Sequence, residues 1–126
     1  MIEEDLYSQL STYEGLTALV KTRIYPLVAP QTVQVPFCVY TKISNERQYS
    51  HGGFSNLERV RMQVSCYAET YAGTRAVVAQ VIAAIAAWPA VNAKVQAALQ
   101  ENEVDFYDDG TQLYHLPVDF FIWYGI

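Results

Sequence analysis

The sequence predicts an α+β domain in which a four-stranded antiparallel or mixed sheet carries a long helix on one face, with one or two short N-terminal helices. Three patterns support this. Residues 59–67 alternate between polar and apolar side chains, which is typical of a half-buried strand. Residues 70–88 show the 3.6-residue apolar spacing of a helix. Residues 114–124 alternate again after the turn residues Asp109 and Gly110, which predicts a closing hairpin.

The N-terminal region is expected to form two short helices. Ile2, Leu6 and Leu10 recur every four residues, which places one apolar stripe on a helix. Ser11, followed three residues later by Glu14, has the spacing of a capping box and predicts the start of a second helix.

A proline-rich connector and a first strand should follow. Pro26 and Pro30 fix φ, remove two backbone donors and bias the preceding residues away from helix, so residues 23–30 are expected to be extended. Aromatic and β-branched residues then predict a strand over residues 37–43. We expect Phe37, Val39, Thr41 and Ile43 to face inward, and Tyr40 to face outward.

Residues 44–56 are expected to form a long mobile loop. The segment is polar, contains Gly52 and Gly53, and lacks periodicity. We expect it to be disordered in the free subunit and to become ordered on docking to a partner.

Two prolines in the second half of the chain predict where a helix ends and where a strand is left unpaired. Pro89 is expected to end the long helix. Residues 92–100 fit either helix or strand, and we predict a strand over residues 95–107. Pro117 cannot donate to a sheet ladder, so the last strand should lie at an edge or present this position to an unpaired side.

Composition narrows the classes of function. The 126 residues are expected to form a single domain, residues 1–126. With 52% hydrophobic and 17% charged residues, the chain is apolar enough to suggest burial against other subunits. A net charge of -5 with scattered cations argues against sequence-specific nucleic-acid binding.

The apolar run over residues 76–90 is shorter than the ~20 residues of a bilayer span, so no membrane partner is expected. The N-terminus lacks a secretory signal pattern, so folding in a cytoplasm is expected.

No pattern predicts a catalytic, cofactor or metal site. Cys38 could pair with His51 or His115 as a thiol and base, but no acidic residue is placed to orient the base. The acidic residues between Glu101 and Asp109 do not follow calcium-loop spacing and are expected to form a solvated turn. Cys38 and Cys66 are expected to be buried thiols, and the sequence leaves open whether they pair.

A surplus of aromatic residues marks a candidate contact surface instead. Tyrosine, tryptophan and arginine are enriched at interface hot spots. Such residues on outward faces or in the expected loop form the candidate interface: Arg47, Tyr49, Arg59, Arg61, Tyr67, Phe121 and Trp123. The alternative is that a second layer of the same domain covers this face.

Short segments in a characteristic order link the chain to a known family. They are RIYP at residues 23–26, VAP at 28–30, PFCVY at 36–40, RVRMQVSCY at 59–67, AETY at 68–71 and DFFIWY at 119–124. With these segments the chain resembles the tail completion, or tail-to-head joining, proteins of long-tailed bacteriophages. That family is in turn similar to lambdoid tail terminator proteins.

The resemblance implies a structural virion protein rather than an enzyme. Such proteins cap the tail tube and join it to the capsid connector as a sixfold ring. The implied partners are further copies of the chain, the tail tube protein and the connector or head-closure protein. The implied location is the head–tail junction of a virion that is assembled in the bacterial cytoplasm. The alternatives are a neck or head-closure protein and a small α+β enzyme.

Overall fold

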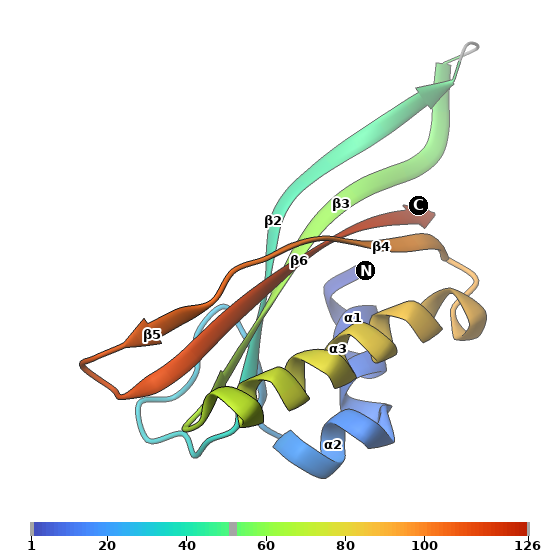
Figure 1. The fold of residues 1–126 in the computed structure, drawn as a ribbon. Helices are drawn as coiled ribbons and strands as arrows, with labels where there is room; N and C mark the ends of the chain where they lie inside the picture. Colours follow the sequence, from blue (N-terminus) through green and yellow to red (C-terminus); the bar gives the residue numbers. More distant parts are fainter. Residues whose placement is uncertain (1, 51–52, 126) are drawn as a thin grey trace.

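The computed structural model describes residues 2–50 and 53–125 and has the predicted α+β architecture (Figure 1). Its elements in chain order are α1 (Ile2–Thr12), α2 (Glu14–Val20), β1 (Ile24–Pro26), β2 (Phe37–Ser50), β3 (Gly53–Ala68), α3 (Tyr71–Val91), β4 (Val95–Glu103), β5 (Phe106–Asp108) and β6 (Leu113–Gly125). The two short N-terminal helices and the long helix are confirmed. The sheet has six strands instead of the four predicted, because the three-residue strand β1 joins it and the strand predicted over residues 95–107 divides into β4 and β5.

The sheet is mostly antiparallel, and the helices lie on one of its faces (Figure 1). Its strand order is β1-β2-β3-β6-β4, with β5 also paired to β6. Only the β1–β2 pair is parallel among the described strands. We call the face opposite the helices the open face.

The N-terminal helices form as predicted, but their boundary has a different cause. Leu6 and Leu10 belong to the apolar stripe of α1 and are fully buried. The predicted capping box is wrong: Ser11 lies in the last turn of α1, where its hydroxyl donates to the Ser8 carbonyl at 3.4 Å. Tyr13 is the N-cap of α2 and makes no side-chain capping bond.

The centre of the core lies between α3 and the strands β3 and β6. Of the residues predicted to face inward on these strands, Tyr114 is only half-buried and the others are buried: Val60, Met62, Val64, Cys66, Leu116, Val118, Phe120, Ile122 and Tyr124. Helix α3 covers them with Val81, Ile85 and Trp88. Thr70 caps this helix by accepting a bond from the Gly73 amide at 3.0 Å. In the described part of the chain, α3 is the one helix long and apolar enough to cross a membrane, and here its buried residues belong to the core.

The predicted faces of β2 are reversed. Cys38 and Tyr40 point into the helix-covered core, whereas Phe37 and Val39 lie on the open face, opposite Tyr67 and Ser65 of β3. Both sets of β2 residues are apolar, so their alternation identifies a strand without identifying its inner side. Phe37 and Val39 are nevertheless buried, because the segment from Leu27 to Val33 lies beside them.

Helix α3 continues past Pro89 to Val91, so the predicted end is two residues early. Pro89 occupies the last turn, where a missing backbone donor removes a single intrahelical bond. The amide of Asn92 then donates to the Trp88 carbonyl at 3.0 Å and ends the helix. The predicted strand begins at Val95 as expected, but it divides into β4 and β5.

The prediction of a loop over residues 44–56 is wrong wherever the backbone is described. Residues 44–50 continue β2 and residues 53–56 begin β3, so the two strands form a long hairpin, while His51 and Gly52 lie outside the described residues. The pairing of β3 with β6 ends at the Leu57–Gly125 pair. Beyond this pair, the hairpin of β2 and β3 extends past the rest of the sheet (Figure 1). No helix covers this extension, so its sequence lacks apolar alternation. The expectation that this segment is disordered in the free subunit therefore loses its basis.

Strand β6 is interior, not an edge strand, because it lies between β3 and β4. Of the two predictions for Pro117, the one confirmed is that it faces a side of the strand where the pairing is interrupted. Its carbonyl accepts a bond from the Val104 amide at 3.3 Å, so its ring nitrogen faces the same side. That side is where the β4–β6 pairing has ended at Glu103 and the β5–β6 pairing begins at Phe106.

One polar bond joins the first helix to the last strand. The Tyr124 hydroxyl donates to the Asp5 carboxylate. This bond lowers the pKa of Asp5, and burial together with the same bond raises the pKa of Tyr124. The bond therefore stabilises the fold between the two pKa values, when Asp5 is ionised and Tyr124 is not.

Trp88→Ala should lower the free energy of unfolding by about 3–5 kcal/mol, because it empties a large site in the core. Urea denaturation would measure the loss. Val91→Ala on the same helix is the control, because Val91 is exposed and should change stability by less than about 0.5 kcal/mol. Similar losses in both variants would contradict the described packing.

Tyr124→Phe should lower the free energy of unfolding by about 1.5 kcal/mol at pH 7, because it removes one of the hydrogen-bond donors to the Asp5 carboxylate. The stabilisation is present above the unfolded Asp pKa of about 4 and is lost as pH falls through the lowered pKa of Asp5. The difference between the two proteins should therefore shrink in acid. A difference that is constant from pH 7 into acid would contradict this account.

Candidate functional site

The open face gathers most of the predicted interface residues. Register places Arg59 opposite Trp123 and Arg61 opposite Phe121 on neighbouring strands. Tyr67 lies further along the same face of β3. The remaining candidates, Arg47 and Tyr49, belong to β2, but their side chains lie outside the described part of the structure.

Arginine and aromatic side chains pack together near the hairpin. The Arg59 guanidinium lies 4.4 Å from the centre of the Phe121 ring, and the Arg61 guanidinium lies 5.9 Å from it. The Phe121 and Trp123 ring centres are 6.4 Å apart. Arg59 also pairs with Glu46 at 3.3 Å. These contacts hold flat, half-exposed side chains against the sheet, a type of surface that binds proteins with little loss of side-chain entropy.

Asp119 is a central residue of this face that the sequence analysis missed. Its carboxylate accepts bonds from Arg61 at 2.5 Å and from Gln63 at 2.9 Å, and its side chain is only 8% exposed. The bond to Asp119 raises the pKa of Arg61. Arg61 is therefore engaged within its own chain, which limits the part that it can take in the candidate interface. Only the strand register, which pairs Gln63 with Asp119, could have revealed this cluster.

A row of stacked rings crosses the other end of the open face. The ring centres of Phe37 and Tyr67 are 4.5 Å apart, and those of Tyr67 and His115 are 4.2 Å apart, with nearly parallel planes in both pairs. Phe106 continues the row at 5.8 Å from His115. Burial lowers the pKa of His115, which favours its neutral form at pH 7. The row joins β2, β3, β6 and β5 into one apolar surface.

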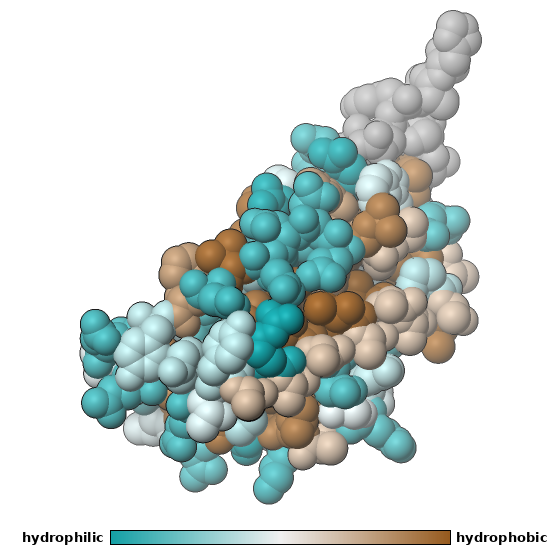
Figure 2. Space-filling model, viewed as in Figure 1, coloured by the Kyte–Doolittle hydropathy of each residue, from teal (hydrophilic) through white to brown (hydrophobic). Residues whose placement is uncertain are grey.

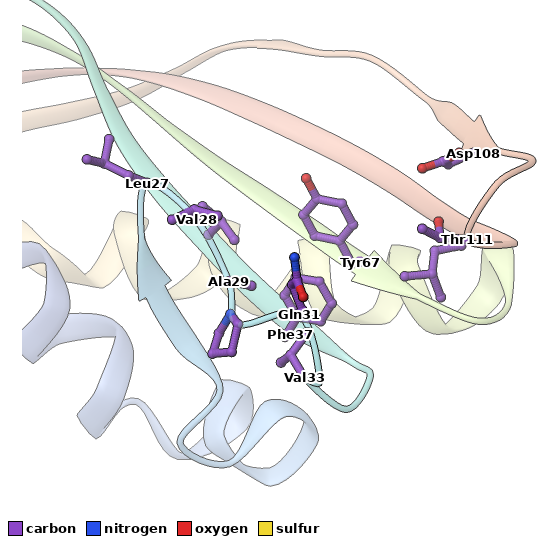
Figure 3. A pocket seen from close by; sticks show the side chains of 12 residues that line it. Leu27, Val28, Ala29, Gln31, Val33, Phe37, Tyr67, Asp108 and Thr111 are labelled. Atoms are coloured by element: carbon purple, nitrogen blue, oxygen red, sulfur yellow. The ribbon is translucent and has the colours of Figure 1, made fainter.

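A groove of about 550 Å³ lies beside this aromatic row (Figure 3). Residues from Leu27 to Val33 form one wall, Asp108, Thr111 and Leu113 form the other, and Tyr67 lies between them. Leu27 and Val28 are 73% and 75% exposed. Leu27 has a φ of 63°, which is costly for a residue other than glycine, while its amide bonds to the Tyr40 carbonyl at 3.0 Å. The chain thus holds two apolar side chains in solvent at the mouth of an apolar groove.

The acidic residues between Glu101 and Asp109 are exposed as predicted, but most lie in strands instead of a turn: Glu101 and Glu103 belong to β4, and Asp108 belongs to β5. The Asp108 carboxylate accepts a bond from the Gly110 amide at 2.9 Å, and the Tyr71 hydroxyl donates to Asp105 at 3.1 Å. These carboxylates have structural partners. Among the described residues, no group of three His, Cys, Asp or Glu side chains is arranged to hold a metal ion.

The proposed thiol–base pairs do not form a site in the described structure. Cys38 is fully buried on the helix-covered side of the sheet, whereas His115 lies on the open face. The sheet itself separates them. The other possible partner, His51, lies outside the described residues.

The outer side of α3 is a second surface with little charge. Its exposed residues are mainly alanines: Ala72, Ala76, Ala79, Ala86 and Ala90. They form a pale apolar band along the helix (Figure 2). Arg75, the one charged residue of α3, pairs with Glu103 at 3.1 Å.

Asp119→Ala should lower the free energy of unfolding by about 2 kcal/mol, because it removes a buried acceptor and leaves Arg61 unpaired. Glu46→Ala is the matched control, since it breaks the exposed pair with Arg59 and should cost less than about 1 kcal/mol. Urea denaturation of both variants would check the order. An equal or larger loss from Glu46→Ala would contradict the assigned role of Asp119.

Comparison with known proteins agrees with the fold and the resemblance. No curated protein matches the chain significantly. A solved chain described as "Virion of native gene transfer agent (GTA) particle" has a similar structure, with a TM-score of 0.73 and 16% sequence identity over 96% of this chain and 92% of that one. The sequence model of the family described as "Tail completion protein gp17" matches residues 4–125, nearly the whole chain. The chain therefore belongs to the tail completion protein gp17 family.

Proposed function

We propose that this protein completes a phage-like tail by binding the end of the assembled tail tube and joining it to the capsid connector. The match to the tail completion family over residues 4–125 carries the proposal. It implies a structural protein of the virion rather than an enzyme. The separation of Cys38 from His115 also argues against the small-enzyme alternative.

The open face is the surface that we assign to contact with other virion proteins. It combines the groove, the stacked aromatic row and the Arg59–Phe121 contact. Large exposed apolar areas on monomers mark interaction sites, because they leave favourable burial energy unused. The strained backbone at Leu27 supports the same assignment, since strain of this kind concentrates at functional positions.

We further propose that copies of the chain form a ring, with six subunits as the family resemblance implies. A cyclic ring uses head-to-tail contacts, so each subunit needs two different surfaces that complement each other. The fold offers two such surfaces on opposite sides: the open face and the alanine-rich outer side of α3 (Figures 1 and 2). Alanines allow close approach by a neighbouring element because their side chains are small.

A neck or head-closure protein is the second structural candidate, and the order of assembly distinguishes it. A head-closure protein would bind the capsid connector before any tail is present. A tail completion protein would be found on separate tails that lack heads.

A nonsense codon in this gene of the parent phage should leave full heads beside unjoined tails. Without the subunit, the tail end has no surface for the connector, and tails should also vary in length. Electron microscopy of lysates would show both effects, and an amber-suppressor host is the control. Normal joined particles in the non-suppressing host would refute the structural role.

Val28→Asp should lower the yield of joined particles at least tenfold, because it puts a charge at the mouth of the groove that we assign to docking. The subunit itself should still fold, since Val28 is 75% exposed. Ala18→Asp is the control, because Ala18 is also exposed but lies on α2, outside both the open face and the outer side of α3. Plaque titre and particle counts would check this, and a normal yield with Val28→Asp would exclude the groove from docking.

A further inference from the structure

We propose that Cys38 and Cys66 are a latent disulfide that closes between β2 and β3 under oxidising conditions. The two residues are directly opposite each other in the β2–β3 register. Their sulfur atoms are 3.9 Å apart, and both residues are fully buried as free thiols.

The backbone at this position suits a disulfide. The Cys38 amide donates to the Arg23 carbonyl at 3.0 Å, so the backbone polar groups of Cys38 point toward β1 and away from β3. Cys38 and Cys66 are therefore a non-hydrogen-bonded pair, in which Cα atoms of antiparallel strands are about 4.5 Å apart. Disulfides span Cα separations from about 4.4 to 6.8 Å. The sulfur atoms can approach by side-chain rotation, without separating the strands.

The same environment keeps the thiols unreactive in the closed fold. The neighbouring Cys38 and burial together raise the pKa of the Cys66 thiol, so the reactive thiolate is scarce. Oxidation thus requires the strand to open or the chain to be still folding. Beside Cys38 the outer edge of β2 is covered only by the three-residue strand β1, which limits what must open.

The chemistry is thiol–disulfide exchange with a small disulfide such as oxidised glutathione. One cysteine thiolate attacks the glutathione disulfide, forms a mixed disulfide and releases one glutathione. The second cysteine thiolate attacks the cysteine sulfur of that mixed disulfide and releases the second glutathione. The protein loses two protons and two electrons, and the glutathione disulfide is reduced to two thiols.

The bond would link β2 to β3 within the body of the sheet, at the end of their pairing that is far from the hairpin tip. It closes a loop that contains the whole hairpin from residue 38 to residue 66, and such a closure restricts the unfolded chain. The timing rests on the proposed function: a virion protein folds in a reducing cytoplasm and meets an oxidising medium when particles are released. The bond itself can be tested on the isolated subunit, so it can fail or succeed independently of a role in tail completion.

The test is to refold the reduced full-length chain in glutathione buffers of increasing oxidised fraction. Acid quenching, alkylation and intact mass measurement then count the free thiols. We expect a monomer with no free thiol in the most oxidising buffer, and a melting temperature about 10 °C above that of the reduced protein. Cys38→Ala is the matched control, because its melting temperature should be the same in reducing and oxidising buffers.

Three results would overturn the proposal. They are a monomer with two free thiols in every buffer, mixed glutathione adducts or intermolecular dimers without the internal bond, and an internal bond that does not raise the melting temperature. None of these readings uses the Cys38→Ala variant, so a failure of that variant to fold would not obscure the outcome.

Discussion

The pairing of β3 with β6 is the constraint on which the rest of the structure depends. It runs without interruption from Leu57–Gly125 to Ala68–Tyr114 and joins the middle of the chain to its end. One face of this pair supplies the centre of the apolar core beneath α3. The other face supplies Arg59, Arg61 and Asp119 of the open face. A slip of one residue would exchange these two sets, exposing the core and burying charges, so the register is strongly specified.

The open face results from what surrounds that pair. The helices cover one side only, so the outward residues of β3 and β6 must satisfy one another. Asp119 does this with Arg61 and Gln63, and the aromatic rings do it by stacking. The segment from Leu27 to Val33 covers part of this face and leaves the groove. A surface of this kind contacts partners through shape and apolar burial more than through charge, which fits a structural role.

Elements with one buried face could be predicted from the sequence, because burial imposes a period on their residues. The inward residues of β3, β6 and α1 were identified in this way, as was the outward position of Arg59, Tyr67 and Phe121. The prediction failed where that signal is weak. The hairpin beyond Leu57 extends past the β6 pairing, and β2 has apolar residues on both sides, with Phe37 and Val39 lying beside the segment from Leu27 to Val33. Asp119 was missed because its role depends on strand register, which a linear pattern does not contain.

The break between β4 and β5 affects the mechanics of the groove. Opposite Pro117 the sheet edge changes from a nine-residue strand to a three-residue one. The backbone of the wall that carries Asp108 is therefore paired to the sheet through the short β5–β6 ladder, and the Tyr71–Asp105 bond ties it to α3. Bending that wall disturbs few backbone bonds, whereas the opposite floor at Tyr67 is part of the central ladder. The groove thus has one compliant side and one stiff side, so it can adjust its width to a partner while the core stays unchanged.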